Sequence, residues 1–157
     1  MNGVVIIDTT LMVLLIVGSA SRNYISRHKR LGSYTVDDFE MLGLIVAEFS
    51  EIVLLPHILT EVSGIARQIG YPARAEIQSV LRTLIATCAE IPVQSIDGAQ
   101  RDEFERLGLT DAVLLHFCAM DVNGIGPTLL TSDTELADSA RSLGYSVIDY
   151  KREFQSG

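Results

Sequence analysis

Short apolar runs alternate along the whole chain with segments of helical periodicity. The runs that predict strands lie at 4–7, 52–55, 89–94, 128–131 and 145–148. Between them, apolar residues recur three or four positions apart, the spacing that places side chains on one face of a helix. Strands that alternate with helices build a mainly parallel sheet with helices on both faces. The sequence therefore predicts an α/β domain of three layers, with a sheet between two layers of helices.

Some details of this arrangement follow from single residues. Pro92 has no amide proton for a strand ladder, so the run at 89–94 is expected at an edge of the sheet. Thr35 should cap a helix that begins near residue 36. The glycine-rich stretch at 123–127 should turn the chain into the run at 128–131.

Chain length and composition predict one domain over residues 1–157. The 157 residues are 48% apolar and 20% charged, and a chain of this size buries roughly 70% of the surface that its unfolded form exposes. Cys88 and Cys118 are too few for a disulfide framework or a thiolate zinc site. We therefore expect a protein of the reducing cytoplasm.

The apolar stretch at 11–17, followed by Gly18, has some features of a secretory signal. No Lys or Arg precedes it, Asp8 interrupts it, and it is far shorter than the roughly 20 residues of a membrane-spanning helix. A buried strand that enters a buried helix explains the stretch better, and no membrane partner is expected.

Four acids stand at strand ends or in the helices that follow them: Asp8, Glu61, Asp111 and Asp133. Acidic side chains beside apolar runs are costly unless they are paired, hydrogen-bonded or bound to a cation. Oxygen-only ligands suit hard divalent ions such as Mg²⁺ and Mn²⁺. Because parallel sheets bind ligands at the carboxyl ends of their strands, the acids are predicted to form a metal site there, provided that the strands of Asp8 and Asp133 are neighbours.

Each acid also has an ordinary structural explanation. Asp111 and Asp133 fall at helix starts, where capping carboxylates are common. Glu61 on an amphipathic helix would usually be solvated. Asp8 is the hardest to explain in this way, since it lies between two apolar runs.

Basic residues gather in one segment of an acidic chain. The net charge of −8 opposes nucleic-acid binding. However, Arg22, Arg27, Lys29 and Arg30 surround His28. The cluster is either a solvated helix face or the last turn of a helix, or else a phosphate-binding group formed by Arg27, Lys29 and Arg30.

Motifs of several other enzyme classes are absent. The sequence has no phosphate-binding loop, dinucleotide-binding glycine motif, serine nucleophile elbow or H-E-x-x-H zinc motif. His57 and Glu61 are four positions apart, as zinc ligands can be, but a third His or Cys ligand is not evident. His116 is expected to be a core histidine.

At the four acids the chain resembles the PIN-domain nucleases. The matching stretches are 4–9 (VVIIDT), 56–62 (PHILTEV), 109–112 (LTDA) and 130–136 (LTSDTEL), followed by 140–148. Their order and spacing cover almost the whole chain. Residues 19–49 depart from the pattern, because they form a longer, helical segment than compact toxin members of the family have there.

The resemblance implies a PIN-like α/β/α domain and an Mg²⁺- or Mn²⁺-dependent endoribonuclease. Asp8, Asp111 and Asp133 would then be metal ligands, directly or through water, and Glu61 would be a ligand or would orient a water molecule. Thr9, Thr131 and Ser132 could support the site or a phosphate through their hydroxyls, although helix capping is the more common role of each. An antitoxin-like protein partner and a homodimer are further possibilities that the family allows.

Two other functions remain open. In a phosphoacceptor domain, either receiver-like or an aspartyl-phosphate phosphatase, Asp8 would carry the phosphoryl group. Position 10 is Thr10 rather than the second Asp of the phosphatase pattern, and residues 1–7 contain no acid, although Lys151 is late enough to serve a receiver. The third possibility is a PIN-like module that binds RNA or protein without catalysis.

Overall fold

A single parallel sheet forms the centre of the computed structural model, which describes residues 3–120 and 125–155. Its strands are β1 (Val4–Ile7), β2 (Glu51–Leu54), β3 (Ala89–Glu90), β4 (Thr128–Thr131) and β5 (Ser146–Asp149). They lie in the order β3-β2-β1-β4-β5, and every neighbouring pair is parallel. The predicted parallel sheet is confirmed. Residues 123 and 124 of the predicted turn lie outside the described residues.

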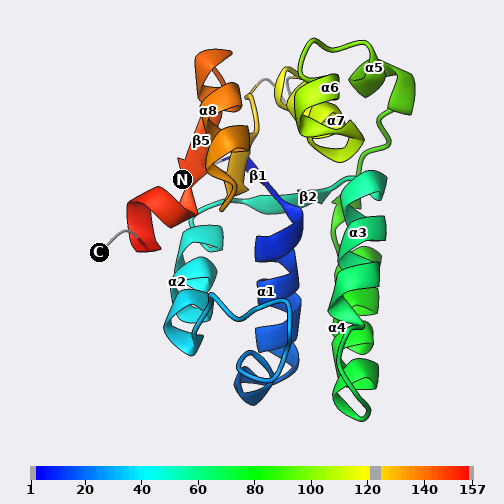
Figure 1. Cartoon of the computed structure of the whole chain (residues 1–157), viewed down its shortest axis with the longest axis vertical. Helices are drawn as coiled ribbons and strands as arrows, with labels where there is room; N and C mark the ends of the chain where they lie inside the picture. The colour runs from blue at the N-terminus through cyan, green and yellow to red at the C-terminus, as the bar shows by residue number, and fades with distance from the viewer. Residues whose placement is uncertain (1–2, 121–124, 156–157) are drawn as a thin grey trace.

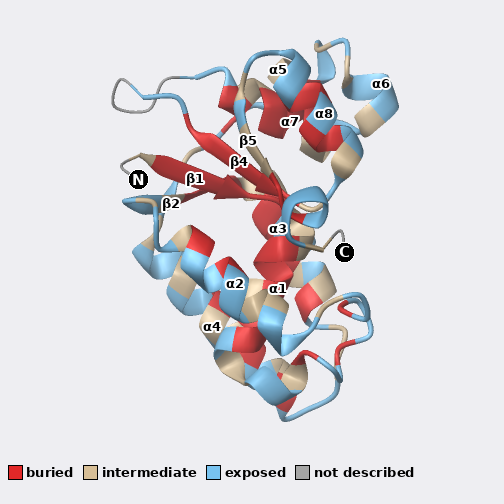
Figure 2. Ribbon diagram, turned by 90° about the vertical axis from the view of Figure 1, so that its left-hand side faces the viewer, coloured by how far each residue is buried: buried red, intermediate tan, exposed pale blue. Residues whose placement is uncertain are grey.

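Helices cover both faces of this sheet (Figure 1, Figure 2). One layer contains α1 (Thr9–Ala20), α2 (Val36–Val46), α3 (Pro56–Ala66) and α4 (Ala73–Thr87). The other contains α5 (Ser95–Ala99), α6 (Phe104–Leu107), α7 (Leu109–Cys118) and α8 (Thr134–Ser142). Two shorter turns complete the description, η1 (Arg22–Tyr24) after α1 and η2 (Lys151–Gln155) after β5. The three-layer α/β/α architecture is therefore confirmed.

Strand β1 and helix α1 form the middle of the core, as the red ribbon in Figure 2 shows. All four residues of β1 are buried, and α1 buries side chains on nearly every side. A helix that is apolar all round needs such an enclosed position. The apolar stretch at 11–17 is thus the central helix of the fold. In the described part of the chain, no helix has the length and apolar character needed to cross a membrane.

The segment 19–49 is helical only in part, because residues 25–35 between η1 and α2 form no helix. A buried imidazole holds this stretch in place. His28 Nε2 donates to the carbonyl of Ala66 at 3.0 Å, while its Nδ1 accepts from the amide of Arg30 at 3.2 Å. Of the two explanations of the basic cluster, the helix face or final helical turn is therefore wrong for Arg27, Lys29 and Arg30.

Two smaller expectations also need correction. Strand β3 does lie at the edge of the sheet but comprises only Ala89–Glu90, since Pro92 cannot continue the ladder. His116 is not a core residue. Its side chain is 36% exposed, and its Nε2 lies 3.8 Å from an Asp97 carboxylate oxygen.

A glycine allows α5 to pack closely against α7. A Cβ atom at Gly98 would lie 2.7 Å from Val113 Cγ2 and 3.0 Å from the Val113 amide nitrogen. The second of these atoms belongs to the backbone of a buried helix and cannot move aside easily. The contact between these two helices therefore requires a residue without a side chain.

We expect Gly98→Ala to lower the free energy of unfolding by about 1–3 kcal/mol, as overpacking does. Gly64→Ala on α3 is the matched control, because a Cβ there meets nothing within 4 Å and should stabilise the helix by up to about 1 kcal/mol. Urea unfolding of both variants measures the difference. Equal stabilities would contradict the close approach of α5 and α7.

Candidate functional site

The strand order creates a crevice at the carboxyl ends of β1 and β4. The chain winds in one direction from β1 to β2 and β3, and in the other to β4 and β5. Open α/β sheets bind ligands at such a reversal point. Ile7 pairs with Leu130, and the amide of Asp8 donates to the Leu130 carbonyl at 3.0 Å. The strands that precede Asp8 and Asp133 are neighbours, as the metal-site prediction required.

All four predicted acids line one cavity of about 430 Å³ at this crevice. Asp8 follows β1, Glu61 comes from α3, Asp111 from the first turn of α7, and Asp133 follows β4. The remaining walls include Thr9, Arg30, Tyr34, Ser132, Lys151 and Gln155. Side chains that are far apart in the sequence are thus brought together by the sheet topology.

Asp8 is the most enclosed of the acids, with 8% of its surface exposed. Its Oδ1 accepts from the amide of Leu11 at 3.4 Å and so caps α1, while its Oδ2 accepts from the hydroxyl of Thr131. Burial raises the pKa of Asp8 from 3.8 to about 6, although both hydrogen bonds oppose the shift. The carboxyl group is held firmly and is costly to ionise.

Asp133 caps α8 through one of its oxygens. Its Oδ1 accepts from the amides of Glu135 at 3.0 Å and Leu136 at 3.2 Å. The capping role expected for an acid here is therefore real, and it occupies Oδ1 only. No hydrogen bond to Oδ2 occurs in the described residues. One carboxylate oxygen of Asp133 remains for a ligand in the cavity.

Asp111 does not act as a helix cap. Gly108 holds the N-cap position of α7, and no side chain makes a capping bond there. The pKa of Asp111 is raised from 3.8 to about 7, first by burial and then by the charges of Asp133, Asp8 and Glu61. The four acids therefore repel one another across the cavity, and a cation would relieve this repulsion.

Two hydroxyls orient Glu61. Its Oε1 accepts from Thr9 at 2.8 Å, and its Oε2 accepts from Thr110 at 2.7 Å. Although Glu61 is exposed, its carboxylate has a fixed direction. Thr9 thus positions an acid rather than capping a helix. Thr110 was missed as a site residue, although it immediately precedes Asp111 in the sequence.

Three further residues of the cavity were not predicted as part of the site. Tyr34 donates its hydroxyl to Ser132 Oγ at 2.8 Å, and burial raises the pKa of Tyr34 above 10.0. Lys151 and Gln155 come from η2, which follows β5. The only sequence signal for them was the position of Lys151 just after a strand end. Tyr34 lies in an irregular segment that gave no signal.

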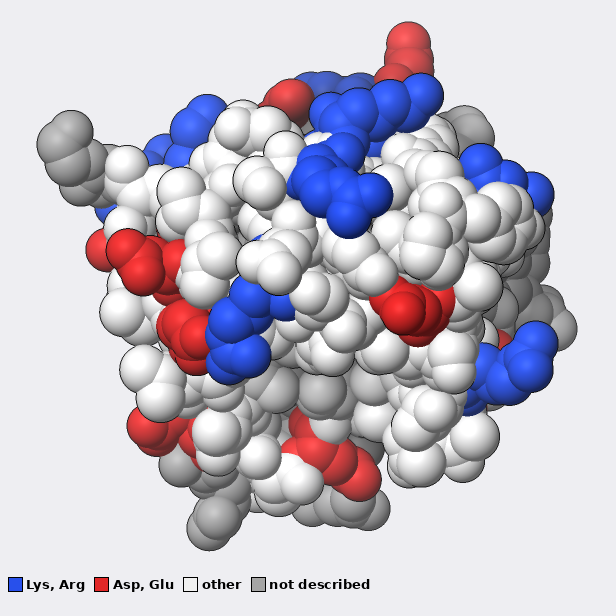
Figure 3. Space-filling view, turned by 90° about the horizontal axis from the view of Figure 1, so that it is seen from below, with Lys and Arg blue, Asp and Glu red and all other residues white. Residues whose placement is uncertain are grey.

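The predicted basic cluster reaches the site through one residue. Arg30 lines the cavity, whereas Arg27 and Lys29 do not, and the Arg27 guanidinium lies over the Tyr24 ring at 5.2 Å. Within residues 3–120 and 125–155, neither Arg30 nor Lys151 forms an ion pair. Figure 3 shows further Lys and Arg side chains, interspersed with Asp and Glu side chains, on the face seen from below.

The donor set suits a hydrated divalent ion better than an all-protein cage. Among the described residues, no three His, Cys, Asp or Glu side chains lie close enough together to hold a metal ion as they stand. Mg²⁺ is commonly bound by one or two carboxylates while it keeps several waters. Carboxylates that face one cavity with raised pKa values fit that mode. His57 bonds Ser95 at 2.8 Å instead and does not line the cavity.

Comparison of the chain with protein-family models, curated proteins and solved structures finds no match. A functional assignment therefore depends on the residues of the cavity itself.

The raised pKa values predict how stability depends on pH when no divalent ion is present. An acid whose pKa is higher in the folded than in the unfolded state stabilises the fold below pH 3.8. This contribution is lost as the pH rises through about 6 for Asp8 and about 7 for Asp111. In EDTA, stability should therefore fall between pH 4.5 and pH 8.

Asp111→Asn removes one of these titrating groups. The free energy of unfolding should therefore fall with rising pH by less than in wild type, with a difference on the order of 2 kcal/mol. Asp102→Asn, at an exposed acid outside the cavity, is the control and should leave the loss unchanged. Chemical unfolding at several pH values gives the slopes. The same slope in wild type and Asp111→Asn would argue against mutual repulsion in the cavity.

Proposed function

We propose that this protein is an Mg²⁺- or Mn²⁺-dependent endoribonuclease of the kind that its resemblance to PIN-domain nucleases implies. The observation that supports this proposal best is the convergence of Asp8, Glu61, Asp111 and Asp133 on one cavity at the crevice of the sheet. A cation would relieve the repulsion among these acids, and Arg30 and Lys151 in the same wall would attract a phosphate.

The chemistry of phosphodiester hydrolysis fits these residues. A divalent ion held by these acids would lower the pKa of an attacking water and neutralise charge that develops on the phosphate. Asp8 and Asp133 each keep one oxygen in a helix cap, and Asp111 is the acid that carries no cap. Glu61, fixed by Thr9 and Thr110, would orient a water molecule.

Local cations explain how an acidic protein would bind RNA. Arg30 and Lys151 belong to the wall of the acidic cavity. A separate groove between α3 and α4 is lined by Arg67, Arg74 and Arg82. These basic regions would attract a phosphate backbone despite the net charge of −8. A cytoplasmic location, an antitoxin-like partner and a homodimer stay predictions.

One observation favours the phosphoacceptor alternative, because Lys151 lines the same cavity as Asp8. Thr10 stands where the phosphatase pattern has a second Asp, and two observations weigh against a receiver. The strand order β3-β2-β1-β4-β5 differs from the 2-1-3-4-5 order of receiver domains, and residues 1–7 contain no acid. The nuclease is therefore the better proposal.

Purified protein with Mn²⁺ should cleave RNA, and EDTA should stop the reaction. We expect Asp8→Asn and Asp111→Asn to lower the cleavage rate at least about a hundredfold, since each removes charge from the site that binds the ion. Asp102→Asn should cleave as wild type does. Gel analysis of fluorescently labelled RNA of defined sequence gives the rates.

Cleavage no faster in wild type than in Asp8→Asn would refute the nuclease. If Mn²⁺ raised the melting temperature of wild type but not of Asp133→Asn, without cleavage of any RNA, a non-catalytic binding module would be favoured. Covalent labelling of Asp8 by a small phosphodonor would favour the phosphoacceptor instead.

A further inference from the structure

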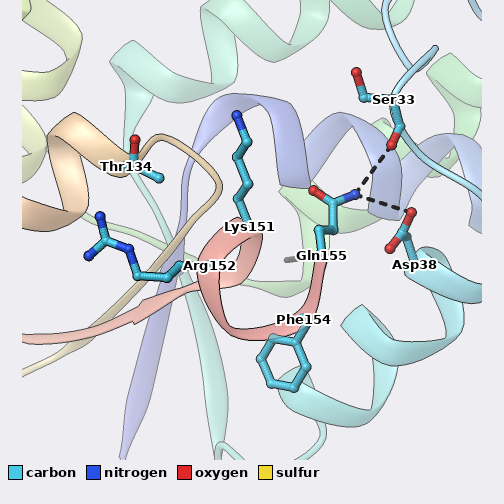
Figure 4. A pocket seen from close by; sticks show the side chains of 7 residues that line it. All are labelled: Ser33, Asp38, Thr134, Lys151, Arg152, Phe154 and Gln155. Atoms are coloured by element: carbon cyan, nitrogen blue, oxygen red, sulfur yellow. Dashed lines mark hydrogen bonds between the residues drawn. The ribbon is translucent and has the colours of Figure 1, made fainter. Parts of the chain in front are cut away.

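A second cavity adjoins the acidic one. It has a volume of about 600 Å³, and it shares three wall residues with the acidic cavity, namely Ser33, Lys151 and Gln155. The turn η2 therefore forms part of the wall of two neighbouring compartments. Figure 4 shows that Lys151 and Phe154 leave this turn in opposite directions.

Phe154 gives the second cavity an aromatic wall. Its side chain is 43% exposed, although its ring stacks on Tyr150 with centroids 5.3 Å apart and an interplanar angle of 23°. Tyr150 is buried, and its hydroxyl donates to Asp38 Oδ1 at 2.8 Å. The ring of Phe154 is thus held by the core while part of its surface stays open to a ligand.

Polar groups surround this ring. The Gln155 amide nitrogen donates to the Ser33 carbonyl and to Asp38 Oδ2, both at 3.3 Å, which fixes the direction of the Gln155 side chain (Figure 4). The Thr134 hydroxyl and the Lys151 ammonium have no hydrogen-bond partner in the described part of the chain. An aromatic surface with oriented donors and acceptors is typical of a nucleoside site.

We propose that the second cavity binds an unpaired nucleotide of the RNA, with its base stacked on Phe154 and its linking phosphate on Lys151. This inference rests on the proposed nuclease function and names the form of its substrate. Lys151 lines both compartments, so a phosphate that it binds joins this nucleotide to the one above the four acids. A base within a duplex is covered on both faces by its neighbours, so the strand must be single at this point.

Binding can be measured without cleavage by fluorescence anisotropy of a labelled single-stranded RNA of ten nucleotides in EDTA. Phe154→Leu keeps apolar volume but loses the aromatic face, so it should weaken binding about tenfold. Phe154→Tyr keeps an aromatic ring that can stack on both Tyr150 and the base, so this variant should bind RNA as wild type does. Phe104→Ala, at a ring on α6 that is 38% exposed, is the matched control and should have no effect.

Two further comparisons test the details of the assignment. An otherwise identical oligonucleotide with abasic positions should bind wild type and Phe154→Leu equally. Lys151→Gln should reduce the slope of log K against log salt by about 0.7, the loss of one phosphate contact. Melting temperatures of all variants identify any that fail to fold.

Equal affinity of wild type and Phe154→Leu for the single strand would overturn the inference, as would the absence of binding by wild type. These outcomes are distinct from failure of the nuclease proposal, which depends on cleavage with Mn²⁺. Cleavage that is unaffected by Phe154→Leu, together with unchanged affinity, leaves the nuclease and removes the nucleotide site. If binding depends on Phe154 but no RNA is cleaved, the nucleotide site is retained and the nuclease is refuted.

Discussion

The hydroxyl of Thr131 joins the two strands on which the site depends. It donates to Asp8 Oδ2 at the end of β1 and accepts from the amide of Asp133 at 3.0 Å after β4. This contact is possible only because β1 and β4 are adjacent in the sheet. The reversal of winding at this pair of strands determines which loops meet, and the cavity, its four acids and its neighbouring compartment all follow from that order.

Capping and ligand binding are compatible roles for the same acids. Asp8 caps α1 and Asp133 caps α8, so the positive ends of two helix dipoles meet at one cavity. The amide groups at these two helix ends partly offset the repulsion between the acids. Because a carboxylate has two oxygens, Asp8 and Asp133 can each cap a helix with one oxygen and still offer the other side of the group to a ligand.

The sequence predicted those parts of the structure that depend on local pattern. The apolar runs of β1 and β4 and the capping residue Thr35 of α2 located the starts of these elements within a residue or two, and strand ends located Asp8 and Asp133. Long-range contacts determined the rest. His28 holds residues 25–35 in place through its hydrogen bond to the Ala66 carbonyl on α3. Tyr34, Lys151 and Gln155 reach the cavity from segments that have no helical or strand periodicity. The metal, the RNA and the chemistry remain predictions.

The C-terminal turn links the cavity wall to the first turn of α2. Tyr150 is almost fully buried and reaches Asp38, which completes the capping box of α2 with Thr35, while the next residue, Lys151, faces the acids. The last turn is thus both an anchor and a wall. A substitution in η2 would therefore disturb both the wall of the cavity and the anchor of α2.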